Sequence, residues 1–257
     1  MFSAGPLIDF YPCPDGRKHV TARRNFEMKT IGLIGGMSWE STQFYYQQIN
    51  EAVRQHLGGL HSAKLLLNSV DFAPIENLQH AGDWDATAEI LSQAARSLEA
   101  GGADFFLICT NTMHKVADAV AGSVNIPLLH IADATAAILK QDNVSRIGLL
   151  GTGFTMEQAF YKGRLADAHG IEVIVPDSED RATVHEIIYR ELCLGEVKPA
   201  SKQAYLQIID RLRDQRVDGI ILGCTEICML VDQSDTPVKI YDTTAIHARQ
   251  AVDWALN

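Results

Sequence analysis

The sequence predicts an α/β fold of two pseudosymmetric domains, each a four-stranded parallel sheet flanked by helices, with the active site in the cleft between them. Short apolar segments alternate with helical patterns four times, and the same order then starts again. Parallel strands require long crossovers, which are usually helices. Two stretches, FFLICTNTMHK (105–115) and GIILGCTEICM (219–229), also share one form, an apolar segment that ends in small polar residues.

The first half is organised around strands that end in glycine or small polar residues. Thr30–Gly36 is a β-rich segment, Ser38 can cap the helix that follows, and Gly58-Gly59 ends that helix. Apolar residues at helical spacing predict a core-facing helix over Asp85–Ala100. We expect further strands at Ala63–Val70, Asp104–Cys109 and Pro127–Ile131, and a helix at Thr112–Ala121.

The second half repeats this order. Arg146–Thr152 resembles Thr30–Gly36, and the spacing from Gly32 to Thr110, 78 residues, nearly equals the 76 residues from Gly148 to Cys224. A repeat of this length indicates two similar domains. The expected strands are Ile171–Val175, Asp218–Gly223 and Val238–Tyr241, and the expected helices are Thr155–His169, Val184–Leu194, Pro199–Arg216 and Ala245–Leu256.

These repeats predict the domain limits. Residues 28–130 with 243–257 form the first domain, residues 131–242 form the second, and residues 1–27 form a poorly ordered extension. In open parallel sheets, ligands bind beyond the carboxyl ends of the strands. Thr110 and Cys224 each follow such a strand, so we expect them to face each other across the cleft.

Composition narrows the classes of function. Hydrophobic residues make up 47% of the chain, which is enough for a large core, and no apolar stretch approaches the roughly 18 residues of a membrane span. A net charge of −10 argues against nucleic acid or an anionic membrane as partner. The five cysteines show no zinc-site spacing, and residues 1–27 lack the apolar core of a secretory signal, so we expect a cytoplasmic protein without a metal.

The glycine-rich segment GLIGGMS raises the alternative of a nucleotide-binding protein. The GxGxxG spacing is absent and no acidic residue closes the second strand to bind a ribose. The favoured interpretation is a turn whose backbone N–H groups receive an anion such as a substrate carboxylate. Cys224 is the sharpest chemical candidate, because a thiol at a helix start is expected to have a lowered pKa.

Several motifs in order resemble the aspartate/glutamate racemase family. The resemblance spans nearly all of residues 28–257. The motifs are GLIGGMSWEST (32–42), TNTMHK (110–115), HIADAT (130–135), GTGFTM (151–156), IIYRELCLG (187–195), GCTE (223–226) and DTTAIHA (242–248). The pairing of Thr110 with Cys224 is similar to a branch of the family that acts on aspartate and glutamate and prefers the L form.

The resemblance implies a small-molecule substrate, an acidic amino acid (aspartate or glutamate), which is racemised by two-base transfer of the Cα proton without pyridoxal phosphate, another cofactor or a metal. Thr110 and Cys224 would be catalytic, and a homodimer is expected. Where many relatives have Cys-Asn-Thr, this chain has Thr110-Asn111-Thr112, so the thiol is lost on one face. Cys109 cannot replace it, because alternation along the strand turns it away from the cleft. The implied substrate-binding residues are Met37, Ser38, Gln79, Asn111, Thr112, Thr152, Thr155, Thr225 and Glu226.

Some assignments stay open at this point. Gln79 is expected in a loop that borders the cleft, and Lys115, Arg181 and Arg190 are candidate cations for a distal carboxylate. His130 and Asp242 suit helix caps. The alternatives are a related enzyme of the hydantoin racemase, maleate isomerase or arylmalonate decarboxylase type, and a non-catalytic amino-acid-binding protein that kept the cleft.

Overall fold

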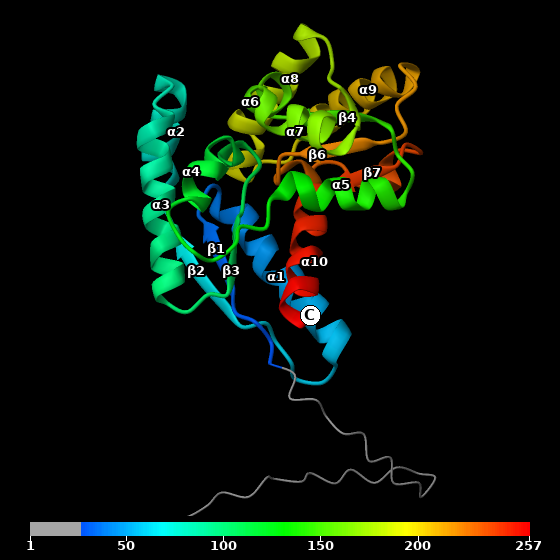
Figure 1. The fold of residues 1–257 in the computed structure, drawn as a ribbon. Helices are drawn as coiled ribbons and strands as arrows, with labels where there is room; N and C mark the ends of the chain where they lie inside the picture. The colour runs from blue at the N-terminus through cyan, green and yellow to red at the C-terminus, as the bar shows by residue number, and fades with distance from the viewer. Residues whose placement is uncertain (1–26) are drawn as a thin grey trace, which may run out of the picture.

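Two parallel sheets form two lobes of the chain (Figure 1). The computed structural model describes residues 27–257, so the predicted extension lies outside the described residues except for Glu27. The α/β fold with two sheets flanked by helices is as predicted. None of the described helices is long and apolar enough to cross a membrane.

The first sheet contains three strands in the order β2-β1-β3, all parallel. They are β1 (Ile31–Gly35), β2 (Leu65–Ser69) and β3 (Phe105–Ile108). The fourth strand predicted at Pro127–Ile131 is wrong, since this segment makes only an isolated bridge between Leu128 and Phe106. Pro127 has no N–H to donate, and His130 already caps the next helix, so the segment is too short for a ladder.

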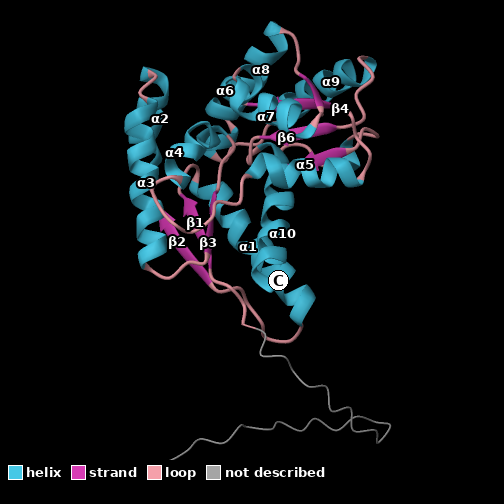
Figure 2. Cartoon of the chain, in the orientation of Figure 1, coloured by secondary structure: helices cyan, strands magenta, loops and turns pink. Residues whose placement is uncertain are grey.

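Alternating residues of the first sheet pack against two different layers. Phe105 and Leu107 belong to the core under α1 (Trp39–Leu57) and α10 (Thr243–Leu256). Phe106 and Ile108 belong to the core under α3 (Trp84–Ala100), on the opposite face. Figure 2 shows these helices flanking the three strands. The all-buried pattern of β3 follows from this two-sided cover.

Helix α2 (Phe72–Ala81) is present although the sequence pattern did not predict it. The Asp71 side chain accepts a hydrogen bond from the Ala73 N–H at its start, and Gly82 ends it in a left-handed conformation with φ 73°. Gln79, expected in a loop, therefore lies on a helix and is buried.

The second sheet contains four parallel strands in the order β5-β4-β6-β7. Its core is one cluster that includes residues of every strand, and helices cover both faces. The strands are β4 (Arg146–Gly151), β5 (Glu172–Ile174), β6 (Ile220–Gly223) and β7 (Ile240–Asp242). The helices are α5 (Ile131–Gln141), α6 (Gly153–Glu157), α7 (Ala159–His169), α8 (Ser178–Arg190) and α9 (Pro199–Asp214).

Two helix starts mark where the chain passes between the lobes. His130 caps α5 with its side chain, and Asp242 caps α10 by accepting from the N–H groups of Thr244 and Ala245. Helix α10 then packs along α1, and the Lys29 N–H donates to the Ala255 carbonyl, so the first and last described segments are neighbours. Short 3-10 helices, η1 (Thr112–Val116) and η3 (Ile227–Met229), follow β3 and β6.

Candidate active site

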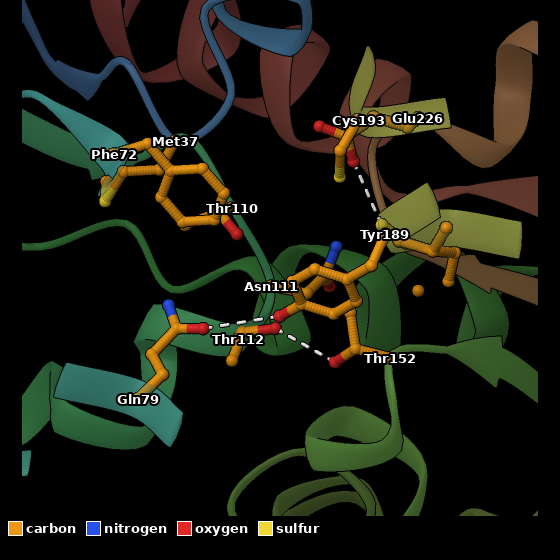
Figure 3. Close-up of a pocket in the computed structure, with 13 residues that line it drawn as sticks. Met37, Phe72, Gln79, Thr110, Asn111, Thr112, Thr152, Tyr189, Cys193 and Glu226 are labelled. Carbon is orange, nitrogen blue, oxygen red and sulfur yellow. Dashed lines mark hydrogen bonds between the residues drawn. The ribbon is translucent and has the colours of Figure 1, made fainter. Parts of the chain in front are cut away.

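A cavity lies between the lobes, where the carboxyl ends of β3 and β6 face each other (Figure 3). About 370 Å³ of space between its walls is free of protein atoms, and this volume includes the part that is open to solvent. Thr110 follows β3 and Cys224 follows β6, so residues from the two repeats share one site, as the strand ends predict. The lining residues are Met37, Phe72, Gln79, Thr110, Asn111, Thr112, Thr152, Ile188, Tyr189, Cys193, Gly223, Cys224 and Glu226.

The predicted site residues gather around this cavity. Eight of the eleven line it, and the other three support lining residues through hydrogen bonds. The Ser38 and Thr225 hydroxyls donate to the Glu226 carboxylate, at 2.7 and 2.8 Å. The Thr155 hydroxyl lies 3.2 Å from that of Thr152.

The Cys224 thiol is held in a small buried network. Its Sγ donates to Oε2 of Glu226 at 2.9 Å. Burial, reinforced by the negative Glu226, raises the pKa of the Cys224 thiol well above its usual value. The predicted lowering is therefore wrong, because the helix after Cys224 is a 3-10 turn of three residues and a carboxylate stands beside the thiol. At neutral pH the free protein carries a thiol here, with a proton acceptor in contact.

Thr110 and Asn111 form the opposite wall. The Asn111 Nδ2 donates to the Thr243 hydroxyl at 3.0 Å, which in turn donates to the Leu222 carbonyl. The Asn111 Oδ1 is buried and has no hydrogen-bond partner in the described part of the chain. A buried acceptor without a donor is costly, so this oxygen is suited to a ligand N–H group. Cys109 points into the core beneath α1 and α10, as strand alternation predicted.

Three side-chain hydrogen bonds join the two lobes across the cavity. Ser38 donates to Glu226, the Thr112 and Thr152 hydroxyls lie 3.1 Å apart, and the Tyr189 hydroxyl donates to Oε1 of Gln79 at 3.3 Å. These bonds fix the distance between the walls. They also fix Gln79, whose Nε2 otherwise reaches only the Met113 sulfur at 3.7 Å.

The candidate cations for a distal carboxylate do not line the cavity. Lys115 lies over the Trp84 ring at 3.8 Å, Arg181 pairs with Glu157, and Arg190 pairs with Glu186. The lining residues therefore include no lysine, arginine or histidine. The neutral donors that line the cavity in their place include the Gln79 amide and the Tyr189 hydroxyl. The lining residues Phe72, Ile188 and Tyr189 were not predicted from the sequence.

The glycine turn after β1 uses its own N–H groups. The Gly36 N–H donates to the Thr42 hydroxyl at 2.8 Å, and Ser38 accepts from the Ser41 N–H as the cap of α1. The prediction that this turn receives an anion is therefore wrong for Gly36, whose donor is already used. Among the described residues, no group of three or more His, Cys, Asp or Glu side chains could hold a metal ion.

Fold and site together define a two-lobed α/β protein with a thiol and a hydroxyl in one interlobe cavity. The sequence model of the Asp/Glu/hydantoin racemase family matches residues 34–251, and the chain belongs to this family. It is 24% identical over 223 residues to the broad specificity amino-acid racemase RacX of Bacillus subtilis strain 168, covering 86% of this chain and 96% of that protein.

Solved structures agree with this assignment. A crystal structure from Yersinia pestis, assigned by its description to the Asp/Glu racemases as a candidate member, is 58% identical with a TM-score of 0.84, covering 90% of this chain and all of the other. A structure from Pyrococcus horikoshii OT3, described as an aspartate racemase homologue, is 35% identical with a TM-score of 0.78 and the same coverage. The family and RacX carry the name racemase, which supports amino-acid racemase activity in general terms.

Proposed function

We propose that the protein racemises aspartate or glutamate, with preference for the L form, by moving the Cα proton between Cys224 and Thr110 without a cofactor. The observation that carries this proposal is the pairing in one cavity of a thiol and a hydroxyl from equivalent strand ends, with Glu226 in contact with the thiol. Two groups on opposite faces of a Cα are the minimum that a 1,1-proton transfer requires.

In the L to D direction, proton transfer begins at Cys224. Cys224 first passes its thiol proton to Oε2 of Glu226 and becomes a thiolate. The thiolate removes the Cα proton, and the Thr110 hydroxyl, directly or through a water, returns a proton to the opposite face. Thr110 recovers its proton from solvent and Glu226 releases one, so the enzyme returns to its initial state.

The cavity walls supply the contacts that orient an amino acid. The unpartnered Asn111 Oδ1 is suited to the ammonium group, and the Thr112 and Thr152 hydroxyls can donate to the α-carboxylate, where charge develops in the transition state. The Gln79 Nε2 and the Tyr189 hydroxyl are the donors available to a distal carboxylate. Neutral donors bind a carboxylate less strongly than a guanidinium does, so we expect a high KM.

Deuterium incorporation at Cα in heavy water tests the proposal, with each enantiomer of aspartate and glutamate measured separately and no cofactor added. We expect incorporation with the wild type, faster from the L form, and none above background with Cys224→Ala. Cys228→Ala is the matched control, because this half-buried thiol donates to the Thr225 carbonyl and does not line the cavity. Incorporation that survives Cys224→Ala would exclude the proposed role of the thiol.

Replacing Thr110 by cysteine tests the assignment of the second face. A thiol is far more acidic than a hydroxyl, so Thr110→Cys should raise the rate from the D form, by about tenfold or more, and bring the two directions closer together. Initial rates from pure D and pure L substrate, followed by chiral chromatography, give the ratio. An unchanged or lower rate from the D form would contradict a proton-transfer role for Thr110.

The alternatives give different results when deuterium incorporation is combined with a thermal-shift measurement. A non-catalytic binding protein shows a thermal shift with amino acids but no incorporation, and a nucleotide-binding protein shows a shift with nucleotides. A related isomerase or decarboxylase leaves amino acids unlabelled.

We also propose a cytoplasmic homodimer with α1 at its interface, since Trp39 and Tyr46 are 65% and 58% exposed two turns apart on that helix. Light scattering of the wild type and of Tyr46→Glu tests the assembly.

A further inference from the structure

His114 is a buried histidine that bonds the backbone of Thr110. It lies in η1, four residues after Thr110, and is 3% exposed. Its Nδ1 is 2.8 Å from the Thr110 carbonyl oxygen, and its Nε2 is 3.2 Å from the Ile131 backbone nitrogen. The ring itself does not line the cavity.

These two contacts fix the tautomer of the ring. The Ile131 N–H can only donate, so Nε2 accepts, and the Thr110 carbonyl can only accept, so Nδ1 carries the proton. Burial and the neighbouring His130 lower the pKa of His114 well below its usual value, which keeps the ring neutral. In a protonated ring Nε2 would also carry a proton, and this N–H would face the N–H of Ile131.

The contact at Nε2 attaches the Thr110 turn to a firmly held helix. Ile131 is the first residue of α5, the helix that enters the second lobe. Asp133, two residues further in the first turn of α5, accepts two bonds of 2.7 Å from Arg164 on α7 and lies 3.0 Å from Nε2 of His169. A bidentate pair of this kind holds the helix start in place. His114 therefore bridges Thr110 to a fixed point outside the turn.

We propose that His114 is the positioning residue for Thr110, holding the Thr110 carbonyl through Nδ1–H and so keeping the hydroxyl opposite Cys224. This inference rests on the proposed racemisation. Because Cys224 is supported separately, by Glu226, the loss of His114 should impair one face of the reaction and spare the other. That asymmetry distinguishes positioning from general support of the fold.

Two replacements of similar polarity separate the two contacts. An asparagine amide nitrogen takes the place of Nδ1 and can still donate to the Thr110 carbonyl, whereas a glutamine amide reaches the place of Nε2. We expect His114→Gln to lower the formation of D product from L substrate by about tenfold or more, while deuterium incorporation into unreacted L substrate stays within about twofold. His114→Asn should restore most of the D product.

His130→Asn is the matched control. The His130 ring lies 4.4 Å from that of His114, but its Nδ1 accepts from the Ala132 N–H to cap α5, and asparagine can do the same. This variant should leave the ratio of the two rates unchanged. Thermal unfolding of each variant verifies that it is folded at the assay temperature.

Several results would overturn the inference. An equal loss on both faces, no loss in His114→Gln, or the same rates in the Asn and Gln variants would each contradict positioning. ¹⁵N NMR of the wild-type ring gives a readout that needs no activity, and a proton on Nε2 in place of Nδ1 would also contradict it. If the wild type labels no amino acid, the proposed function fails, and the tautomer measurement still decides the bonding of His114.

Discussion

At the scale of single residues, the proposed racemisation depends on the contact between Cys224 and Glu226. The pKa of the thiol is raised, so Cys224 is protonated in the resting protein and can donate to a carbanion that forms from D substrate. To act as a base on L substrate it must first lose its proton, and Oε2 of Glu226 lies at 2.9 Å to take it. One pair can thus serve both directions.

Replacing Glu226 by glutamine separates these two effects. The negative charge raises the pKa of Cys224, so its removal should lower that pKa and shift alkylation of Cys224 by iodoacetamide to lower pH. The proton acceptor is lost at the same time, so deuterium incorporation into L substrate should fall about 100-fold. Mass spectrometry of the Cys224 peptide against pH gives the midpoint. Ser38→Ala, which keeps the carboxylate, is the control, and an unmoved midpoint in Glu226→Gln would contradict the electrostatic account.

At the scale of elements, the turn between β1 and α1 is the most constrained. Gly36 has φ +92°, and a Cβ there would lie 2.1 Å from the Val70 carbonyl oxygen. The Gly36 N–H also donates a hydrogen bond to the Thr42 hydroxyl. The turn brings Met37 to the cavity and places Ser38 where its hydroxyl donates to Glu226. The close approach of the Val70 backbone, more than anion binding, explains why position 36 is a glycine.

We expect Gly36→Ala to lower the free energy of unfolding by about 3 kcal/mol or more, since it adds a backbone clash to the strain of a positive φ. Gly58→Ala is the comparison. Gly58 also has a positive φ, 73°, but nothing lies within 4 Å of a Cβ there, so only the conformational cost of about 1 kcal/mol remains. Urea unfolding measures both, and equal losses would show that the contact with Val70 is relieved easily.

The same elements show how far the sequence predicts this molecule. The repeated strand and polar turn placed Thr110 and Cys224 in one cavity, because strand ends in parallel sheets meet at one edge. Pro127 has strand-like apolar neighbours, but only pairing partners decide whether an extended segment becomes a strand. The prediction of a lowered pKa for Cys224 was wrong for a similar reason. That pKa depends on the burial of the thiol and on the carboxylate of Glu226, and a rule based only on the helix start includes neither.

At the scale of the whole molecule, neutral histidines are buried where the lobes join. His247 lies between the Tyr45 hydroxyl and the Leu129 carbonyl, each at 2.9 Å, and ties α10 to α1 and to the segment before α5. Its pKa is lowered to about 3, first by burial and then by His114. That of His130 is also lowered to about 3, by burial and by Arg164. Charging either ring therefore costs free energy in the folded protein.

Acid should therefore weaken the protein well above the pKa range of its carboxylates. In the unfolded chain histidine has a pKa of about 6.5, so between pH 6.5 and about 3 the unfolded state binds more protons than the folded state. The contribution of these neutral rings to the free energy of unfolding is fully present above pH 6.5. Below that pH it falls by about 1.4 kcal/mol per pH unit for each histidine. Urea unfolding at pH 7 and pH 5 should differ by about 4 kcal/mol for these two rings, and His114, whose pKa burial and His130 also lower, adds to that difference. His130→Asn keeps the cap of α5 and should reduce that difference by about 2 kcal/mol. Equal stability of the wild type at the two pH values would show that the rings are hydrated or already charged in the folded protein.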